Sequence, residues 1–362
     1  MKGGSDIAID MDIRKAPVQS PPEIAGRYDD YRVEPFGDDA LAFRLIVPAD
    51  MDAIALDDVE VPAGGQRVIG AFETRAEPVH RLEVAVVRPG YEVDVLDYVG
   101  LTAELSGLAA EEAQWIRAGG GKTGVESVLR FGEGPGGRVA RSFAFADGPR
   151  IFLVTLVVPP ADEKARLDAY ALARDSFEPL LPWGARYAEG FEPHEAEFLT
   201  GAPPIRFLRP LSWRLDEVDD PTFGRCVIAL RLVDGLGLRA RLKLAAVVRG
   251  EEEEPLRRFL DAVCEAAHLD GFAPVGASEV YELDAPGGGG FEPRALGAHS
   301  TGWTADGGRA DLLGLALRTP DVSYGIVALL PDPAADAIGW LAGKRAQAIL
   351  AQSLREGGGG SR

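Results

Sequence analysis

The stretch LEVAVVR at residues 82–88 places leucine and valine at alternate positions, the pattern of a β-strand with one buried face. A similar stretch, LKLAAVVR, stands at residues 242–249. A second pair consists of LVTLVVP at residues 153–159 and IVALLP at residues 326–331. Each pair has one member in each half of the chain. This repetition predicts that one folding unit occurs twice.

The elements around these stretches follow the same order in both halves: strands, a helix, strands, a helix. The helices are expected at 93–105 and 162–177 in the first half, and at 252–268 and 334–354 in the second. A further helical piece is expected at 109–117. The predicted fold class is α+β, with two tandem domains that each form an antiparallel sheet covered by helices.

A chain of 362 residues is long enough for two domains of about 100–200 residues. The predicted division of the chain is an acidic N-terminal arm at 1–30, a first domain at 31–180, an apolar, proline-containing linker at 181–204, a second domain at 205–355 and a glycine-rich tail at 356–362.

The composition argues against several functional classes. Asp and Glu number 57 against 38 Lys and Arg, a net charge of −19, which disfavours nucleic acids and anionic membranes as partners. No apolar run approaches the ~20 residues of a membrane span. The polar N-terminus lacks the apolar stretch of a secretory signal, and the chain has 2 cysteines. We therefore expect a cytoplasmic protein.

Motifs for catalysis or metal binding are incomplete. The GGGKT sequence at 119–123 would need a glycine at Ile116 to match a phosphate loop, so a turn is expected there. Cys264 and His268 are four apart, but neither Cys226 nor the other histidines add further ligands at a metal-site spacing. No Gly-x-Ser-x-Gly sequence occurs. The sequence predicts no enzyme, no metal and no cofactor.

The element order, together with Ser176 and Phe177 at the end of the second expected helix, resembles the PsbP-like and DcrB-like superfamily. The resemblance spans 31–180 and again 205–354. It implies an antiparallel sheet covered by helices and a non-catalytic role. Members include photosystem accessory subunits, a nuclear-import factor that binds a small GTPase, and chaperones for membrane-inserting effectors of type VI secretion. The chaperones look closest in character, but they are generally single-domain, and the resemblance transfers no site residue.

Two sheet faces are candidate binding surfaces. The central strands are apolar or small on both faces, so something should cover each face. One reading is that helices and the linker cover them, and the other is that two copies frame a groove for an apolar client helix. The candidate client-binding positions are Ala140, Ser142, Ala144, Ala146, Gly314, Ala316, Gly325 and Val327.

A basic strand face is the second candidate surface. Its residues are Arg225, Arg231, Arg241 and Lys243. They alternate with apolar residues, as on a solvated strand face, and could also dock the acidic N-terminal arm or an acidic partner.

These features together predict a non-catalytic cytoplasmic binding protein, a chaperone or adaptor for a secreted or membrane-inserting client. The alternative is a structural accessory subunit of a larger secretion or membrane-associated assembly. An intramolecular pseudo-dimer is compatible with the two copies, and the sequence leaves the oligomeric state open.

Overall fold

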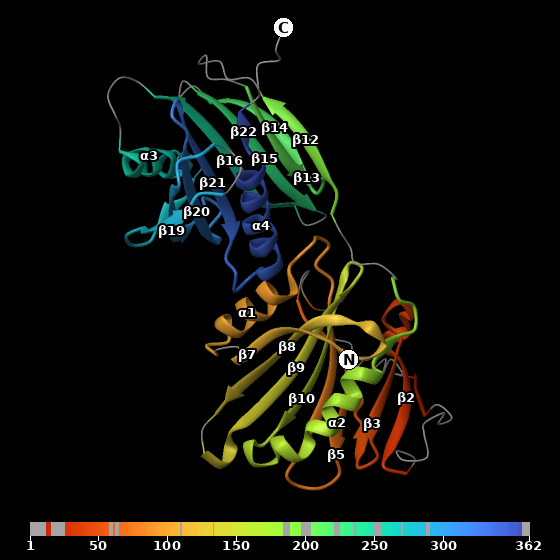
Figure 1. Cartoon of the computed structure of the whole chain (residues 1–362). Coiled ribbons are helices and arrows are strands. Elements are labelled where there is room, and N and C mark those ends of the chain that lie inside the picture. Colours follow the sequence, from red (N-terminus) through yellow and green to blue (C-terminus); the bar gives the residue numbers. More distant parts are fainter. Residues whose placement is uncertain are drawn as a thin grey trace, which may run out of the picture. The chain divides into compact units, whose positions relative to one another are not determined.

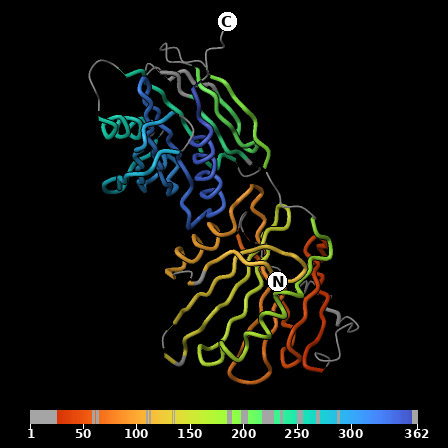
Figure 2. The backbone as a smooth tube through the Cα atoms, in the orientation of Figure 1, coloured from red at the N-terminus to blue at the C-terminus, as the bar shows by residue number. Residues whose placement is uncertain are grey.

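The computed structural model describes residues 12–15, 26–57, 61, 65–108, 111–132, 134–183, 189–196, 204–220, 225–234, 237–249, 255–268, 271–286 and 290–356. The chain divides into two compact units, Met1–Ala188 and Glu189–Arg362, called unit 1 and unit 2 below. The path of the chain through each unit can be followed in Figure 1 and Figure 2.

Unit 1 contains a seven-stranded antiparallel sheet. Its strands, in spatial order, are β4 (Met51–Ala53), β5 (Arg67–Thr74), β6 (Arg81–Val87), β10 (Arg150–Val158), β9 (Arg138–Asp147), β8 (Thr123–Phe131) and β7 (Glu111–Arg117). The predicted strand at 82–88 is thus β6, and it pairs with β5 and β10 near the centre of the sheet.

Two helices and a smaller sheet complete unit 1. Helix α1 (Val95–Leu105) follows β6, and Asp94 caps its N-terminus by accepting the amide hydrogen of Leu96 at 2.8 Å. Helix α2 (Glu163–Ser176) follows β10 and contacts β3, β9 and β10. The smaller sheet has the order β1 (Asp12–Lys15), β2 (Tyr28–Glu34), β3 (Phe43–Pro48) and β11 (Glu178–Pro179).

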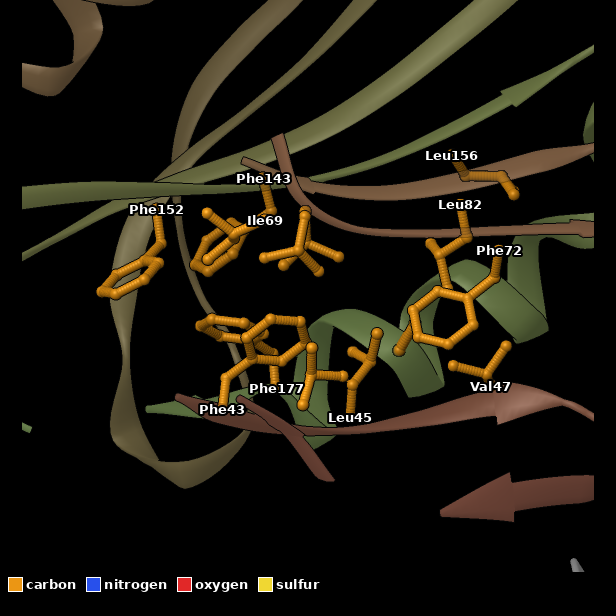
Figure 3. Close-up of a cluster of buried hydrophobic side chains, with 14 of the residues drawn as sticks. Phe43, Leu45, Val47, Ile69, Phe72, Leu82, Phe143, Phe152, Leu156 and Phe177 are labelled. Carbon is orange, nitrogen blue, oxygen red and sulfur yellow. The ribbon is translucent and has the colours of Figure 1, made fainter. Parts of the chain in front are cut away.

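The core of unit 1 lies where the two sheets face each other. Figure 3 shows Phe43 and Leu45 of the small sheet directed toward Ile69 and Phe143 of the large sheet, with Phe177 beside Phe43. All five side chains are fully buried. Alternate residues of a strand face opposite sides, so Phe143 and Phe145 of β9 contribute to this core while their small neighbours face away from it.

Unit 2 contains an eight-stranded antiparallel sheet. Its strands, in spatial order, are β14 (Trp213–Asp220), β15 (Arg225–Asp234), β16 (Gly237–Val248), β21 (Val322–Pro331), β20 (Arg309–Arg318), β19 (Arg294–Trp303) and β17 (Ala273–Pro274), with β18 (Glu279–Asp284) also paired to β19.

The remaining elements of unit 2 occur in the same chain order as in unit 1. Helix α3 (Leu256–His268) follows β16, as α1 follows β6, and α4 (Ala337–Ser353) follows β21, as α2 follows β10. The smaller sheet has the order β12 (Phe191–Ala196), β13 (Ile205–Pro210) and β22 (Arg355–Glu356). No helix in the described ranges has the length and apolar character needed to cross a membrane.

A serine ends the last helix of each unit, and in both units its hydroxyl accepts a hydrogen bond from an amide of the small sheet. The Ser176 hydroxyl accepts the amide hydrogen of Ile46 at 3.0 Å and lies 3.2 Å from the Ala173 carbonyl, to which it donates. The Ser353 hydroxyl accepts the amide hydrogen of Leu208 at 2.8 Å. In each unit a short strand follows the helix and pairs with the small sheet. The serine accepts a hydrogen bond from a small-sheet amide that lies past the end of this pairing. The Ser176 and Phe177 pair noted in the sequence is therefore structural.

Three segments differ from expectation. Residues 109–117, expected as a helical piece, contain strand β7, because pairing with β8 outweighs the helix propensity of the Glu-Glu-Ala-Gln sequence. Strand β12 lies within the expected linker 181–204, and its Pro193 is tolerated because β12 is an edge strand. Strand β1 lies within the expected arm 1–30 and pairs with β2. The remainder of the arm up to residue 25, and the tail from residue 357, lie outside the described residues.

Candidate functional site

Three arginines stand side by side on neighbouring strands of unit 2. Arg214 of β14 lies opposite Arg231 of β15, and Arg231 lies opposite Arg241 of β16. Their sequence neighbours Leu230 and Leu242 face the other side of the sheet and are fully buried. Like charges placed directly opposite each other destabilise a sheet. We call Arg214, Arg231, Arg241 and the adjacent Lys243 the basic face.

Asp216, on β14, lies beside Arg231 on the basic face. Asp216 forms an ion pair with Arg231, and this hydrogen bond raises the pKa of Arg231 above its ordinary value. Lys243 lies two residues beyond Arg241 on the same strand face. Within the described ranges, neither Arg214 nor Arg241 has a carboxylate at ion-pair distance. Among the described side chains of this face, the cations Arg214, Arg231, Arg241 and Lys243 stand beside the paired carboxylate of Asp216, and the charge of Arg241 also helps to lower the pKa of Asp306.

The structure brings together three of the four predicted basic residues. Arg231, Arg241 and Lys243 are neighbours, whereas Arg225 pairs with Asp220 at the far end of β15, about 20 Å along the strand from Arg231. The side chain of Arg225 lies outside the described part of the chain. Sequence reasoning missed Arg214, because the acidic residues of β14 concealed its strand.

The predicted client-binding positions of unit 2 lie beneath helix α3. A Cβ atom built on Gly325 would meet both Val263 methyl groups at 2.8 Å, and one on Gly314 would lie 2.6 Å from the Cys264 sulfur. Ala316 and Val327 are buried against the same helix. The small residues thus allow α3 to pack closely against the sheet, and the protein's own helix covers this part of the face.

The corresponding positions of unit 1 are also covered. Ala140, Ser142 and Ala144 are buried, and Ala146 is partly buried. The Ser142 and Thr155 hydroxyls are hydrogen-bonded at 2.6 Å, and α1 contacts β9. Of the two interpretations drawn from the sequence, the one in which the chain's own elements cover these faces fits the small-residue positions of both units.

A cavity of about 380 Å³ adjoins the basic face in unit 2. It lies among the start of β16, the end of β21 and the turn between β19 and β20. Its lining includes Leu238, Arg241, Asp306, Arg309 and Leu329. Hydrogen bonds from Thr304 and the Gly308 amide lower the pKa of Asp306, so this carboxylate is charged at neutral pH. The cavity thus combines apolar walls with charges of both signs.

A larger cavity, of about 660 Å³ and lined by both polar and apolar residues, lies in unit 1 at the C-terminal end of α2. The GGGKT segment lines it. The anion that the backbone of this segment binds is a carboxylate of the protein itself, that of Asp175. The Gly119 amide donates to the Asp175 carboxylate at 3.1 Å, and the Lys122 ammonium donates to the Asp175 carbonyl at 3.3 Å. Burial lowers the pKa of Lys122. The segment therefore caps the helix, as expected for a turn.

Several charged groups at or beside this cavity are also engaged in contacts within the protein. Arg44 binds the buried carboxylate of Asp30 at 2.9 Å. Arg174 lies 2.8 Å from Asp175, and the Ser176 hydroxyl is used as described above. These contacts suit structure and recognition, and they supply no hydroxyl or thiol activated by a neighbouring base.

A network of ion pairs joins α2 to the large sheet of unit 1. Glu126 accepts hydrogen bonds from Arg141 at 3.1 Å, from Arg174 at 2.8 Å and from the Tyr170 hydroxyl at 3.2 Å. Arg141 also pairs with Glu163 at 3.2 Å. The Glu126 side chain is only 14% exposed. Because each of these charges is partnered, the network anchors the helix.

The cysteine and histidine tested for metal binding are not assembled into a site in the described residues. Burial raises the pKa of the Cys264 thiol to about 11, so it stays protonated beside Gly314. The side chains of Cys226 and His268 lie outside the described part of the chain. Across the described ranges, no three His, Cys, Asp or Glu side chains are placed to hold a metal ion.

No known protein family and no curated protein matches the sequence. Among solved structures, CyanoP, the PsbP protein of Synechocystis sp. PCC 6803, aligns with a TM-score of 0.29 and 14% identity over 50% of this chain and 100% of its own. A protein from Bacteroides thetaiotaomicron aligns at 0.26 and 14% identity over 41% of this chain. The chain covers 48% of that protein's length.

A third similar structure is the type VI secretion immunity protein TplEi of Pseudomonas aeruginosa. It aligns with a TM-score of 0.19 and 12% identity over 86% of this chain and 94% of its own. TplEi has also been solved with a bound "L" peptide. A PsbP protein, the kind that the sequence resemblance named, is thus among the similar structures. All these TM-scores lie below 0.5, so none assigns this chain to a family.

Proposed function

We propose that this chain is a non-catalytic protein-binding module whose partner presents an acidic segment to the basic face of unit 2. The observation that carries the proposal is the row formed by Arg214, Arg231 and Arg241. Such a row costs folding stability, and costs of this kind concentrate at functional sites. An acidic partner would convert the repulsion into attraction.

The finer proposal is a chaperone or adaptor built from two copies of one PsbP-like or DcrB-like domain. The matching chain order of sheets and helices in the two units supports duplication. A secreted or membrane-inserting protein is the proposed client. The basic face gives it a docking surface, since the small-residue faces are covered within the chain.

A structural accessory subunit is the second candidate. Its support is a group of exposed apolar side chains on and beside the outermost strands of unit 2, namely Val275, Tyr281, Leu283 and Trp303, which are 59%, 40%, 41% and 47% exposed. Isolated exposed apolar residues are ordinary, but a group on one sheet edge suits a permanent partner.

Binding of an acidic peptide by the full chain tests the proposal. The probe is a fluorescein-labelled peptide of alternating glutamate and serine, and the comparison peptide has lysine in place of glutamate. We expect fluorescence anisotropy to show binding of the glutamate peptide that weakens with salt, despite the net charge of −19.

Charge reversal locates the binding. Arg231→Glu with Arg241→Glu should weaken the glutamate peptide about tenfold or more, mainly through its association rate. The matched control is Arg206→Glu, which reverses an exposed arginine of β13 in the same unit. Equal affinity in the wild type and the double variant would reject the basic face as the docking surface.

A further inference from the structure

The cavity of about 380 Å³ and the basic face form one continuous surface in unit 2, because Arg241 belongs to both. Arg241 stands in the arginine row and is also one of the residues that line the cavity. A segment that pairs with the row therefore passes the cavity mouth.

The walls of the cavity suit an apolar side chain. Leu238 is 44% exposed, and Ala240, Ala310, Leu329 and Pro331 line the same space. A volume of this size is at the lower end of the range for ligand sites, which suits one large side chain better than a nucleotide or a prosthetic group. An exposed leucine at a cavity wall gains most when an apolar group covers it.

Charges at the mouth set the order of the partner's residues. Asp306, held ionised by its hydrogen bonds, disfavours a second carboxylate inside the cavity. The row from Arg241 to Arg214 extends away from Asp306 across two strand spacings, about 10 Å. Carboxylates are therefore favoured along the row, and a neutral apolar group is favoured at the cavity.

We propose that the partner is an acidic segment with one large apolar anchor residue, which enters this cavity while the adjacent carboxylates pair with the basic face. This inference rests on the proposed function and specifies the partner it needs. A buried apolar anchor beside a charged rim is the usual composition of a tight peptide contact. Arg309 borders the cavity; its guanidinium carbon lies 5.9 Å from the centroid of the Trp303 ring, and it also pairs with Asp332 at 3.9 Å.

The test uses the full chain and two labelled peptides. One has four glutamates followed by phenylalanine, and the other has glycine in place of the phenylalanine. We expect the phenylalanine peptide to bind about tenfold tighter or more, because it buries an aromatic side chain. Both affinities should fall as salt rises.

Two variants of the cavity isolate the anchor contribution. Leu238→Gln removes an apolar wall, and Ala305→Trp narrows the mouth at an exposed turn residue. Each should abolish the advantage of phenylalanine and leave the glycine peptide unchanged. The matched control is Leu208→Gln, at an exposed leucine of β13. Circular dichroism of each variant establishes that it is folded.

The outcomes separate the two proposals. If neither peptide binds the wild type, the proposed function is wrong. If both peptides bind with equal affinity and neither cavity variant matters, the anchor inference is wrong while the basic face retains its role. If the phenylalanine advantage exists but survives both variants, the anchor lies elsewhere and the assignment of this cavity fails.

Discussion

Replacing Gly325 with alanine should loosen helix α3 from its sheet. The added Cβ would lie 2.8 Å from both methyl groups of Val263, where carbon atoms normally approach to about 3.5–4.0 Å. Val263 is 5% exposed and β-branched, so it has essentially one rotamer in a helix and cannot turn aside. The helix must therefore move by about 1 Å.

The expected cost follows from two opposing effects. Overpacking of this kind costs about 1–3 kcal/mol. Replacing glycine in a strand interior returns roughly 0.5–1 kcal/mol of conformational entropy. With the middle of each range, the net loss is about 1.25 kcal/mol, or about an 8-fold increase in local opening. Because the chain has two units, hydrogen exchange of the α3 amides is a better measurement than a single melting temperature.

Three further variants serve as comparisons for Gly325→Ala. Gly314→Ala should cost less, because its close neighbours are the side-chain ends of Cys264 and Leu260. Val263→Ala combined with Gly325→Ala should recover much of the lost protection. Gly100→Ala, at an open position of α1, should raise stability. If the α3 amides of Gly325→Ala are as protected from hydrogen exchange as those of the wild type, or more so, close packing of α3 on these small residues is refuted.

Three other predictions concern stability. Ser353→Ala should cost about 1 kcal/mol, because the Leu208 amide loses its acceptor, and exchange at that amide should accelerate. Glu126→Gln should cost about 3 kcal/mol in urea unfolding of unit 1, because the part-buried arginines around it lose their counter-charge; a loss below 1 kcal/mol would show that the network is dispensable. The carboxylate of Asp311, with an oxygen 3.2 Å from His299 Nε2, raises the pKa of His299 above its ordinary value of 6.5, so the stabilisation from this pair should be complete below that pH and be lost as the pH rises through the raised pKa. His299→Gln should flatten the dependence of unit 2 stability on pH in this window, and an unaltered profile would contradict that role.

The central strands of each sheet could be predicted because their apolar residues either alternate or run consecutively, as in buried strands. Strands β10 and β21 carry consecutive apolar residues, β6 alternates apolar residues at Leu82, Val84 and Val86, and the four helices were expected near their observed positions. The segment of β7 could not be assigned correctly. Its Glu-Glu-Ala-Gln sequence favours a helix in isolation, and its strand state depends on a partner brought close by the fold.

The candidate site was only partly predictable, for a related reason. Alternation of Trp213 and Leu215 with Arg214 and Asp216 is the signal of β14, but the acidic residues after it resemble a solvated loop. The row of arginines exists only in the register between strands. Residues 17 and 10 positions apart in the chain become neighbours there, and periodicity along one strand does not reveal the neighbours across it. The cavity depends on the turn near Asp306 in the same way.

The two surfaces inferred separately from the sequence are parts of one sheet face. Lys243 pairs with Val327 and Arg241 with Leu329, and both apolar partners pack beneath α3. The small residues at Gly314 and Gly325 let the helix lie close, and its coverage falls on β19, β20 and β21. The strands that α3 does not cover carry arginine and lysine on this face. If these positions were apolar, a second helix would be needed to cover them. The placement of α3 therefore determines which part of this face stays available to a partner, and the cationic composition of that part determines the charge that the partner must carry.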